Sequence, residues 1–241
     1  MPDLPAWRWA LGICCALLIG LGKTGAPGAS TLTVPLLVMT VGDARYAAAW
    51  AAPILITGDL FAVSYWRRHA EARALMSLVP WVAVGMLVGA LALGLNEPVL
   101  RRILALVVLA MLLVSVLRRW RPTLKVGGHP SVYGVSAGFA TTVANAAGPV
   151  MSLYLLTKNL PKEQFVATGA WFFLIVNVTK LPIYWSRHLF SPASLLFDLT
   201  MVPAVVCGAF TGLWLVHRIP QRLFDNLILV LTAISTVFLL R

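Results

Sequence analysis

Long apolar stretches follow one another along almost the entire chain, separated by short polar or basic segments. Most have about 20 residues, the length that an α-helix needs to cross roughly 30 Å of hydrocarbon. A membrane β-barrel would alternate apolar and polar positions, which these stretches do not do. The pattern predicts an all-α, polytopic membrane protein. The stretches lie at about residues 9–22, 31–41, 46–66, 74–95, 99–117, 131–157, 164–185, 193–216 and 221–240.

The chain also repeats itself. The sequence YWRRH at Tyr65–His69 returns as YWSRH at Tyr184–His188, a spacing of 119 residues. At a spacing of 123, Gly85-x-x-x-Gly89 returns as Gly208-x-x-x-Gly212. Because small residues let helix backbones approach closely, we expect both GxxxG motifs to pack the third segment of their half against a neighbouring helix.

This duplication predicts how the chain is organised. We expect one transmembrane domain, residues 1–241, built from two related halves. The first repeat covers residues 1–119 and the second covers residues 131–241, joined by a basic cytoplasmic linker at 118–130. Counting residues 9–41 as one interrupted segment, each half has four segments. Eight membrane segments are therefore predicted.

The first segment of each half is interrupted by helix-breaking residues. Gly22–Ser30 contains three glycines and a proline, and Thr141–Pro149 interrupts the second half at the matching place. Lipid cannot satisfy unpaired backbone groups, so such breaks persist only where protein or a wet cavity surrounds them. Two breaks at corresponding positions indicate a transport site.

Each interrupted segment could cross as two half-helices or turn back as a re-entrant hairpin. Hairpins would leave three crossings per half and invert the halves relative to one another. They also give a slightly larger excess of Lys and Arg on one side of the membrane, which favours them.

Composition supports a membrane protein. Apolar residues make up 60% of the chain and charged residues 11%, whereas soluble domains have about a quarter charged residues. The net charge of +11 comes largely from segment ends, as at Arg67–Arg73 and Arg118–Lys125. Such clusters are typical of cytoplasmic loops rather than of nucleic-acid binding. We expect a multi-pass protein of the cell membrane, the bacterial inner membrane, whose surroundings are the lipid bilayer.

Lys23 lies within the first break, beside hydroxyl residues. An anion there would meet an ammonium, hydroxyls and the free N–H groups at the start of a half-helix. Alternatively, the break reaches the surface and Lys23 is solvated. Because charges rarely persist inside a membrane without a role, we favour an anion site. The predicted substrate-binding residues are Lys23, Thr24, Gly25, Gly28, Ser30, Thr31, Thr141, Thr142, Asn145, Gly148, Asn177 and Lys180.

Asp59 and Lys180 are further charges within apolar segments. At the spacing of 119, Asp59 aligns with Val178, two residues from Lys180, so the two could pair. Asp59 could instead carry a coupling proton, which is our first hypothesis. Lys180 could also extend to the interface, and Asp59 could be a structural hydrogen-bond acceptor. Trp50 and Trp171 are weaker candidates for the walls of the site.

One enzyme-like motif needs to be considered. Gly134-x-Ser136-x-Gly138 fits the nucleophile-elbow pattern, but that elbow needs a strand–turn–helix setting. We predict no catalytic residue, metal site or cofactor. A membrane-embedded enzyme and an accessory subunit without transport activity remain alternatives, as does a channel. Transport direction, coupling ion and oligomeric state stay open.

Two stretches resemble a known family. Gly25–Leu37, GAPGASTLTVPLL, and Leu160–Gly169, LPKEQFVATG, resemble motifs of the TauE/SafE sulfite exporter family, also called the 4-toluene sulfonate uptake permease family. The resemblance implies transport, often outward, of small sulfur-containing anions such as sulfite or organosulfonates. Because the sequence has no nucleotide-binding motif, we expect a gradient-driven secondary transporter that works by alternating access about the paired breaks. This chain departs from the family pattern because Lys23 interrupts the first glycine cluster and only Gly148 remains of the second.

Overall fold

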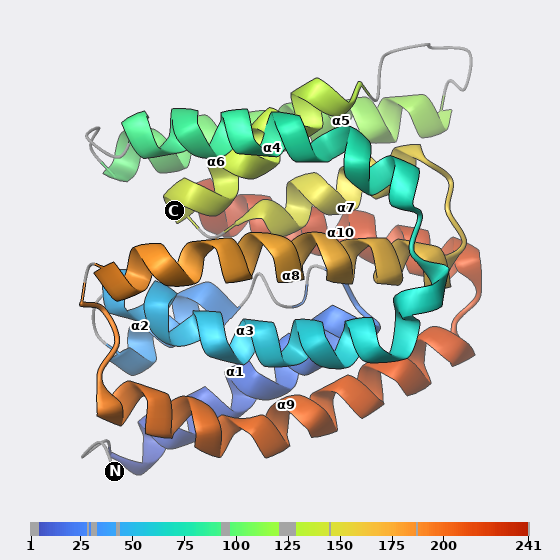
Figure 1. Cartoon of the computed structure of the whole chain (residues 1–241). Coiled ribbons are helices and arrows are strands. Elements are labelled where there is room, and N and C mark those ends of the chain that lie inside the picture. Colours follow the sequence, from blue (N-terminus) through green and yellow to red (C-terminus); the bar gives the residue numbers. More distant parts are fainter. Residues whose placement is uncertain are drawn as a thin grey trace. The chain divides into compact units, whose positions relative to one another are not determined.

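The computed structural model describes residues 5–27, 29, 33–41, 44–92, 97–120, 129–144, 146–186 and 188–240. All regular structure in these ranges is helical, which confirms the all-α prediction (Figure 1). Four of the described helices are long and apolar enough to cross a membrane: α1 (Ala6–Thr24), α4 (Ala72–Ala92), α8 (Lys162–Ser186) and α9 (Pro192–Arg218). The arrangement of eight segments in two halves stays a prediction.

The other elements complete the helical chain. They are α2 (Thr33–Val41), α3 (Ala44–Trp66), the 3-10 helix η2 (Arg67–His69), α5 (Glu97–Trp120), α6 (Pro130–Ala144), α7 (Ala147–Thr157) and α10 (Gln221–Leu240). Of these, α7 is a shorter apolar helix, and α5 contains a further apolar stretch at Leu106–Leu117.

The helices form two compact units. The first unit spans Met1–Ala70 and Lys162–Pro220, and the second spans Glu71–Pro161 and Gln221–Arg241. The first unit therefore contains α1, α2, α3, α8 and α9, and the second contains α4 to α7 and α10. Each unit takes helices from both predicted repeats.

Glycines bring α1 and α9 into backbone contact in the first unit. A Cβ on Gly20 would overlap the carbonyl oxygen of Val205, and a Cβ on Gly208 would overlap that of Leu17. Further along, a Cβ on Gly25 would overlap the backbone of Gly212. Because the contacts advance together along both helices, α1 and α9 run parallel at a distance that only glycine permits.

The same contact recurs between α6 and α4 in the second unit. A Cβ on Gly138 would overlap the carbonyl oxygen of Val82, and one on Gly85 would overlap that of Val135. Contact residues of α1 and α6 differ by 118 positions, and those of α9 and α4 by 123. The prediction that each GxxxG motif packs its helix against a neighbouring helix is confirmed.

Each interrupted segment forms a helical hairpin. In the first unit, the thiol of Cys15 donates to the carbonyl oxygen of Thr33, and Leu37 packs with Ala47 near the start of α3. The helix α2 therefore returns toward the level at which α1 began. In the second unit, the ring of Tyr154 near the end of α7 packs at a tilt against that of Tyr133 near the start of α6, 5.5 Å between centroids. This geometry supports the hairpin alternative in both units.

The second break is shorter than predicted. Helix α6 continues to Ala144 and α7 begins at Ala147, so Thr141, Thr142, Gly148 and Pro149 lie in helices. The predicted interruption over Thr141–Pro149 was wrong in its extent. Pro149 is the third residue of α7, where a backbone N–H would have no partner within the helix, so proline is tolerated there.

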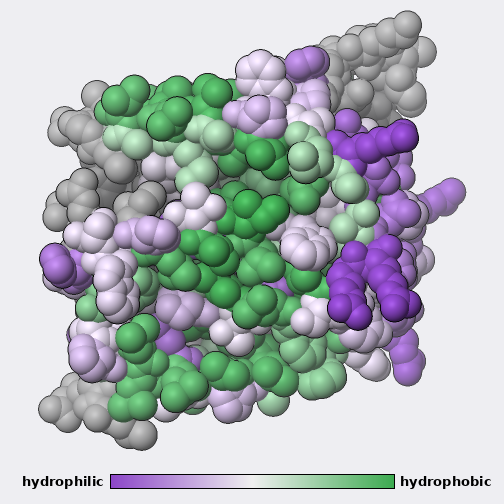
Figure 2. All heavy atoms as spheres, viewed as in Figure 1, coloured by the Kyte–Doolittle hydropathy of each residue, from purple (hydrophilic) through white to green (hydrophobic). Residues whose placement is uncertain are grey.

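The outer faces of the helices are apolar. Leu91 is 86% exposed, Trp185 70% and Leu199 67%, which suits a lipid environment better than water. Figure 2 shows hydrophobic side chains over much of the visible face, with the most hydrophilic ones gathered toward its right edge. Within the first unit, the exposed residues Arg67–His69 of η2 follow directly after α3.

Candidate functional site

Lys23 lies in the last turn of α1, at the point where the first break begins. The helix ends at Thr24, after which the N–H groups of Gly25 and Ala26 both donate to the carbonyl oxygen of Leu21. A cation in the last turn interacts favourably with the negative end of the helix dipole. The end of α1 therefore holds the ammonium group inside the first unit, where Lys23 is 7% exposed.

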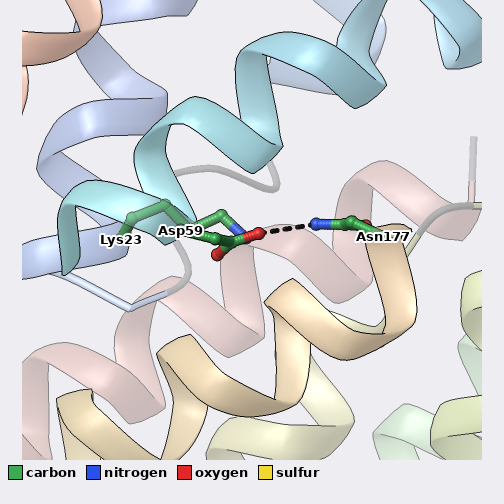
Figure 3. A network of polar contacts seen from close by, with 3 residues as sticks. All are labelled: Lys23, Asp59 and Asn177. Carbon is green, nitrogen blue, oxygen red and sulfur yellow. Dashed lines mark hydrogen bonds and ion pairs between the residues drawn. The ribbon is translucent and has the colours of Figure 1, made fainter. Parts of the chain in front are cut away.

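Three helices meet at this ammonium (Figure 3). The Nζ atom of Lys23 lies 2.7 Å from Oδ1 of Asp59 on α3. The side-chain amide of Asn177 on α8 donates to the other carboxylate oxygen of Asp59 at 2.8 Å. The Asp59 side chain is fully buried and that of Lys23 is 5% exposed.

A second cation belongs to the same group. Lys180 follows Asn177 by three positions on α8, so the two share one face of the helix. Lys180 is 4% exposed and interacts electrostatically with both Lys23 and Asp59. Two lysines and one aspartate give the group, Lys23–Asp59–Lys180, a formal excess of one positive charge. We call it the charged cluster.

Two neighbours shape the charged cluster. A Cβ on Gly58 would lie 3.1 Å from Cγ of Lys23, so this glycine lets the lysine chain lie against α3. The Nζ atom of Lys23 lies over the ring of Phe173 on α8, 4.2 Å from the ring centroid. An aromatic face attracts a cation at this distance, and it also offers an apolar surface to any bound molecule.

A charged group of this kind contributes little to stability on its own. Removing two charges from water costs several kcal/mol per ion, which their attraction offsets only in good geometry. Apolar residues of similar volume would serve packing as well or better. Charges buried at membrane depth therefore indicate a functional site.

The structure brings four of the predicted site residues together: Lys23, Asp59, Asn177 and Lys180. Sequence reasoning offered Lys180 as one alternative partner of Asp59 and did not consider its ion pair with Lys23. The repeat does indicate the other partner of Asp59. At the spacing of 118 shown by the glycine contacts, Asp59 aligns with Asn177, which donates to its carboxylate.

The other predicted residues lie elsewhere. The Thr24 hydroxyl is within hydrogen-bonding distance of the carbonyl oxygens of Gly20 and Ala209, at 3.0 and 2.7 Å, and Gly25 packs on Gly212. In the second unit, the Thr142 hydroxyl donates to the carbonyl oxygen of Gly138. Thr141 is buried near the end of α6, and Gly148 lies in the first turn of α7. Gly28, Ser30, Thr31 and Asn145 lie outside the described residues.

The two tryptophans proposed as walls take part in packing. The ring of Trp50 lies 5.3 Å from that of Phe197, centroid to centroid, in a cluster between α1, α3 and α9. Trp171 packs against a small cluster that contains Ala62, Val63 and Ala170. Phe173 is the aromatic side chain found against the ammonium, and the sequence did not single it out.

We expect Asn177→Leu to lower the free energy of unfolding by about 1–3 kcal/mol, because Asp59 then keeps a buried carboxylate oxygen without its amide donor. Denaturant unfolding of the purified protein in detergent measures the change. Thr179→Val is the matched control, since Thr179 is exposed on the same helix and, among the described residues, its hydroxyl donates to Ile175 of that helix. Equal losses in both variants would contradict the role of Asn177.

Comparison with known proteins adds one finding. The family model described as sulfite exporter TauE/SafE matches residues 11–239, which is nearly the entire chain and contains every residue of the charged cluster. No curated protein and no solved structure matches the chain.

Proposed function

Because the chain belongs to the sulfite exporter TauE/SafE family, we propose that it is a secondary carrier that exports a small sulfur-containing anion at the charged cluster. Family membership makes it a membrane transporter of the exporter type and argues against an enzyme. The substrate, the binding residues and the coupling are our proposals.

The excess positive charge of the cluster is the observation that carries this proposal. Lys23 forms an ion pair with Asp59, and Lys180 is buried within electrostatic range of both. A monovalent anion would neutralise the group, whereas a cation would add to its charge. Sulfonates and hydrogen sulfite carry one negative charge and several acceptor oxygens. Phe173 would face an organic substituent, which favours an organosulfonate over inorganic sulfite.

Competition for Lys23 offers a route to coupling. An arriving anion would take the ammonium from Asp59, leaving that carboxylate with Asn177 as its donor. A buried carboxylate without a counter-ion is costly, so Asp59 would take Lys23 back when the anion leaves. The site would thus alternate between a state with the ion pair and a state with the anion bound, and a proton gradient would supply the energy for export.

Burial of the cluster favours a carrier over a channel. Lys23, Asp59 and Lys180 are each less than a tenth exposed, so an ion reaches them only after the surrounding helices move. Alternating access requires such an occluded arrangement, whereas an open pore would keep its charged groups wet. The hairpins α1–α2 and α6–α7 also support inverted halves.

The enzyme alternative gains no support from the described helices. Ser136, the centre of the G-x-S-x-G pattern, lies inside α6, between Pro130 and Ala144. A nucleophile elbow requires a sharp turn between a strand and a helix, which a helix interior does not provide.

The proposed function is tested by adding anions to the purified wild-type protein. Organosulfonates and sulfite should raise its melting temperature in a concentration-dependent manner, and cations of similar size should not. Labelled sulfonate should exchange across proteoliposomes in counterflow. No stabilisation by any sulfur-containing anion, together with no counterflow, would reject the proposal.

Lys180→Met should weaken anion binding by about tenfold or more, since a charge-assisted hydrogen bond contributes about 1.5–3 kcal/mol. Titration of the melting temperature with sulfonate measures the shift. Lys158→Met is the control, because Lys158 is an exposed lysine in the second unit. An unchanged affinity in Lys180→Met would remove Lys180 from the site.

A further inference from the structure

A second buried carboxylate lies in the first unit, apart from the charged cluster. Asp198 is on α9, in the second turn after the capping box formed by Ser191 and Ser194. It is 5% exposed, and neither of its side-chain oxygens has a hydrogen-bond partner among the described residues. It belongs to the stripe of buried residues along α9, which also includes Met201 and Val205.

The neighbourhood of Asp198 is apolar and aromatic. The preceding residue, Phe197, packs against Trp9 and Trp50 and lies against Gly12 of α1. The helices packed against α9 are α1 and α3. Their described titratable side chains are Arg8, Cys14, Cys15 and Lys23 on α1 and Tyr46, Asp59 and Tyr65 on α3. In the described part of the chain, no cation is within ion-pair distance of Asp198.

Asp198 lies well away from the substrate group. Phe197 contacts α1 at Gly12, whereas Lys23 lies eleven residues further along the same helix. At about 1.5 Å per residue, the two levels are roughly 16 Å apart. Asp198 therefore does not contribute to the charged cluster directly. The parallel contact between α1 and α9 nevertheless connects the part of α9 that carries Asp198 with the end of α1 that carries Lys23.

We propose that Asp198 is a proton-binding site that couples transport to the proton gradient. A carboxylate buried without donors is far less costly as the neutral acid than as an anion. While α1, α3 and α9 are packed around it, the group holds its proton. When these helices separate and water enters, the ionised form becomes hydrated and the proton is released. One such cycle per exported anion would carry one proton inward, opposite to the anion.

This inference rests on the proposed carrier function and extends it to a second residue. Asp59 serves as the counter-ion of Lys23 and is exchanged against the substrate. Asp198 takes no part in binding the anion and acts through the opening and closing of the contact between α1 and α9. The two carboxylates therefore have separable effects: substitution of Asp198 leaves anion binding intact.

The experiment compares wild-type protein, Asp198→Asn and Asp225→Asn in proteoliposomes. The amide imitates the protonated acid in shape and cannot release a proton. Asp225 is the matched control, because it accepts a hydrogen bond from Gln221 on α10 in the second unit. Sulfonate-induced stabilisation, sulfonate counterflow without a gradient, and accumulation driven by an imposed pH gradient are measured for each.

Asp198→Asn should keep anion stabilisation and counterflow but lose accumulation driven by the pH gradient, falling to the equilibrated level. Asp225→Asn should behave as wild type. Infrared difference spectra between wild type and Asp198→Asn should contain the C=O stretch of one protonated carboxylic acid. Asp198→Glu, which restores a proton site, should recover part of the accumulation.

Two results would overturn the inference, and a third would overturn the proposed function. Unchanged gradient-driven accumulation in Asp198→Asn would show that the carboxyl carries no coupling proton. Absence of the carboxylic acid band would show that Asp198 is ionised and holds no proton. Loss of anion stabilisation in wild type itself would reject the proposed function rather than the role of Asp198.

Discussion

Lys23→Met is expected to abolish anion-induced stabilisation and sulfonate counterflow. The substitution keeps the length of the side chain and removes the ammonium that lies 2.7 Å from Asp59. It also leaves a buried carboxylate without its cation, so the free energy of unfolding should fall by about 3–5 kcal/mol. Melting curves with and without sulfonate, and counterflow in proteoliposomes, measure the two effects separately.

A double substitution separates binding from folding. Lys23→Met combined with Asp59→Asn removes both charges, so most of the lost stability should return while anion binding stays absent. Lys162→Met is a useful comparison, because Lys162 donates to the backbone carbonyls of Val216 and Ile219 and has no part in the charged cluster. Anion stabilisation that persists in Lys23→Met would remove the lysine from the site.

Gly208→Leu should have the largest effect on the fold. Any side chain at this position would meet the carbonyl oxygen of Leu17 on α1, and backbone cannot move aside as a side chain can. Overpacking a close contact costs roughly 1–3 kcal/mol, and a clash with backbone belongs at the upper end or beyond it. We expect a loss of about 3 kcal/mol or more in unfolding free energy and little folded protein after purification.

Cys207→Leu is the matched control for this substitution. Cys207 precedes Gly208 on the same helix, but its side chain is exposed on the outer surface. The added leucine would face lipid there and should leave stability nearly unchanged. Similar behaviour of the two leucine variants would show that α1 and α9 do not rely on their glycine contact.

The packing of α1 on α9 and of α6 on α4 was partly predictable from sequence. The repeated GxxxG motifs indicated a close helix contact in each half, and both contacts are present. The partner helix was not predictable. A glycine motif indicates that another helix backbone can come close, but it does not indicate which helix that is. Pairing of Gly208 with α1, nearly 190 residues earlier, depends on how the entire chain folds.

The candidate site was also predictable only in part: its residues were, but their contacts were not. Lys23, Asp59, Asn177 and Lys180 stood out because polar and charged residues are rare in apolar segments. Which of these residues contact each other was not predictable in the same way. A spacing of 119 aligns Asp59 with Val178, one residue away from Asn177, which donates to its carboxylate. A shift of one position turns a helical residue by about 100°, which is enough to lose the contact. Asp198 was overlooked because it lies near the start of its apolar segment.

Sequence by itself determined the class of this protein, its apolar helices, its repeated motifs and the residues that stand out chemically. These properties follow from local hydrophobicity and residue spacing, which any single stretch of chain displays. Only the tertiary structure decided that Lys23 pairs with Asp59, that Lys180 is buried near this pair, and that Asp198 is buried without a donor among the described residues. Burial and pairing depend on three helices meeting at one point, and that information is distributed over residues far apart in the chain.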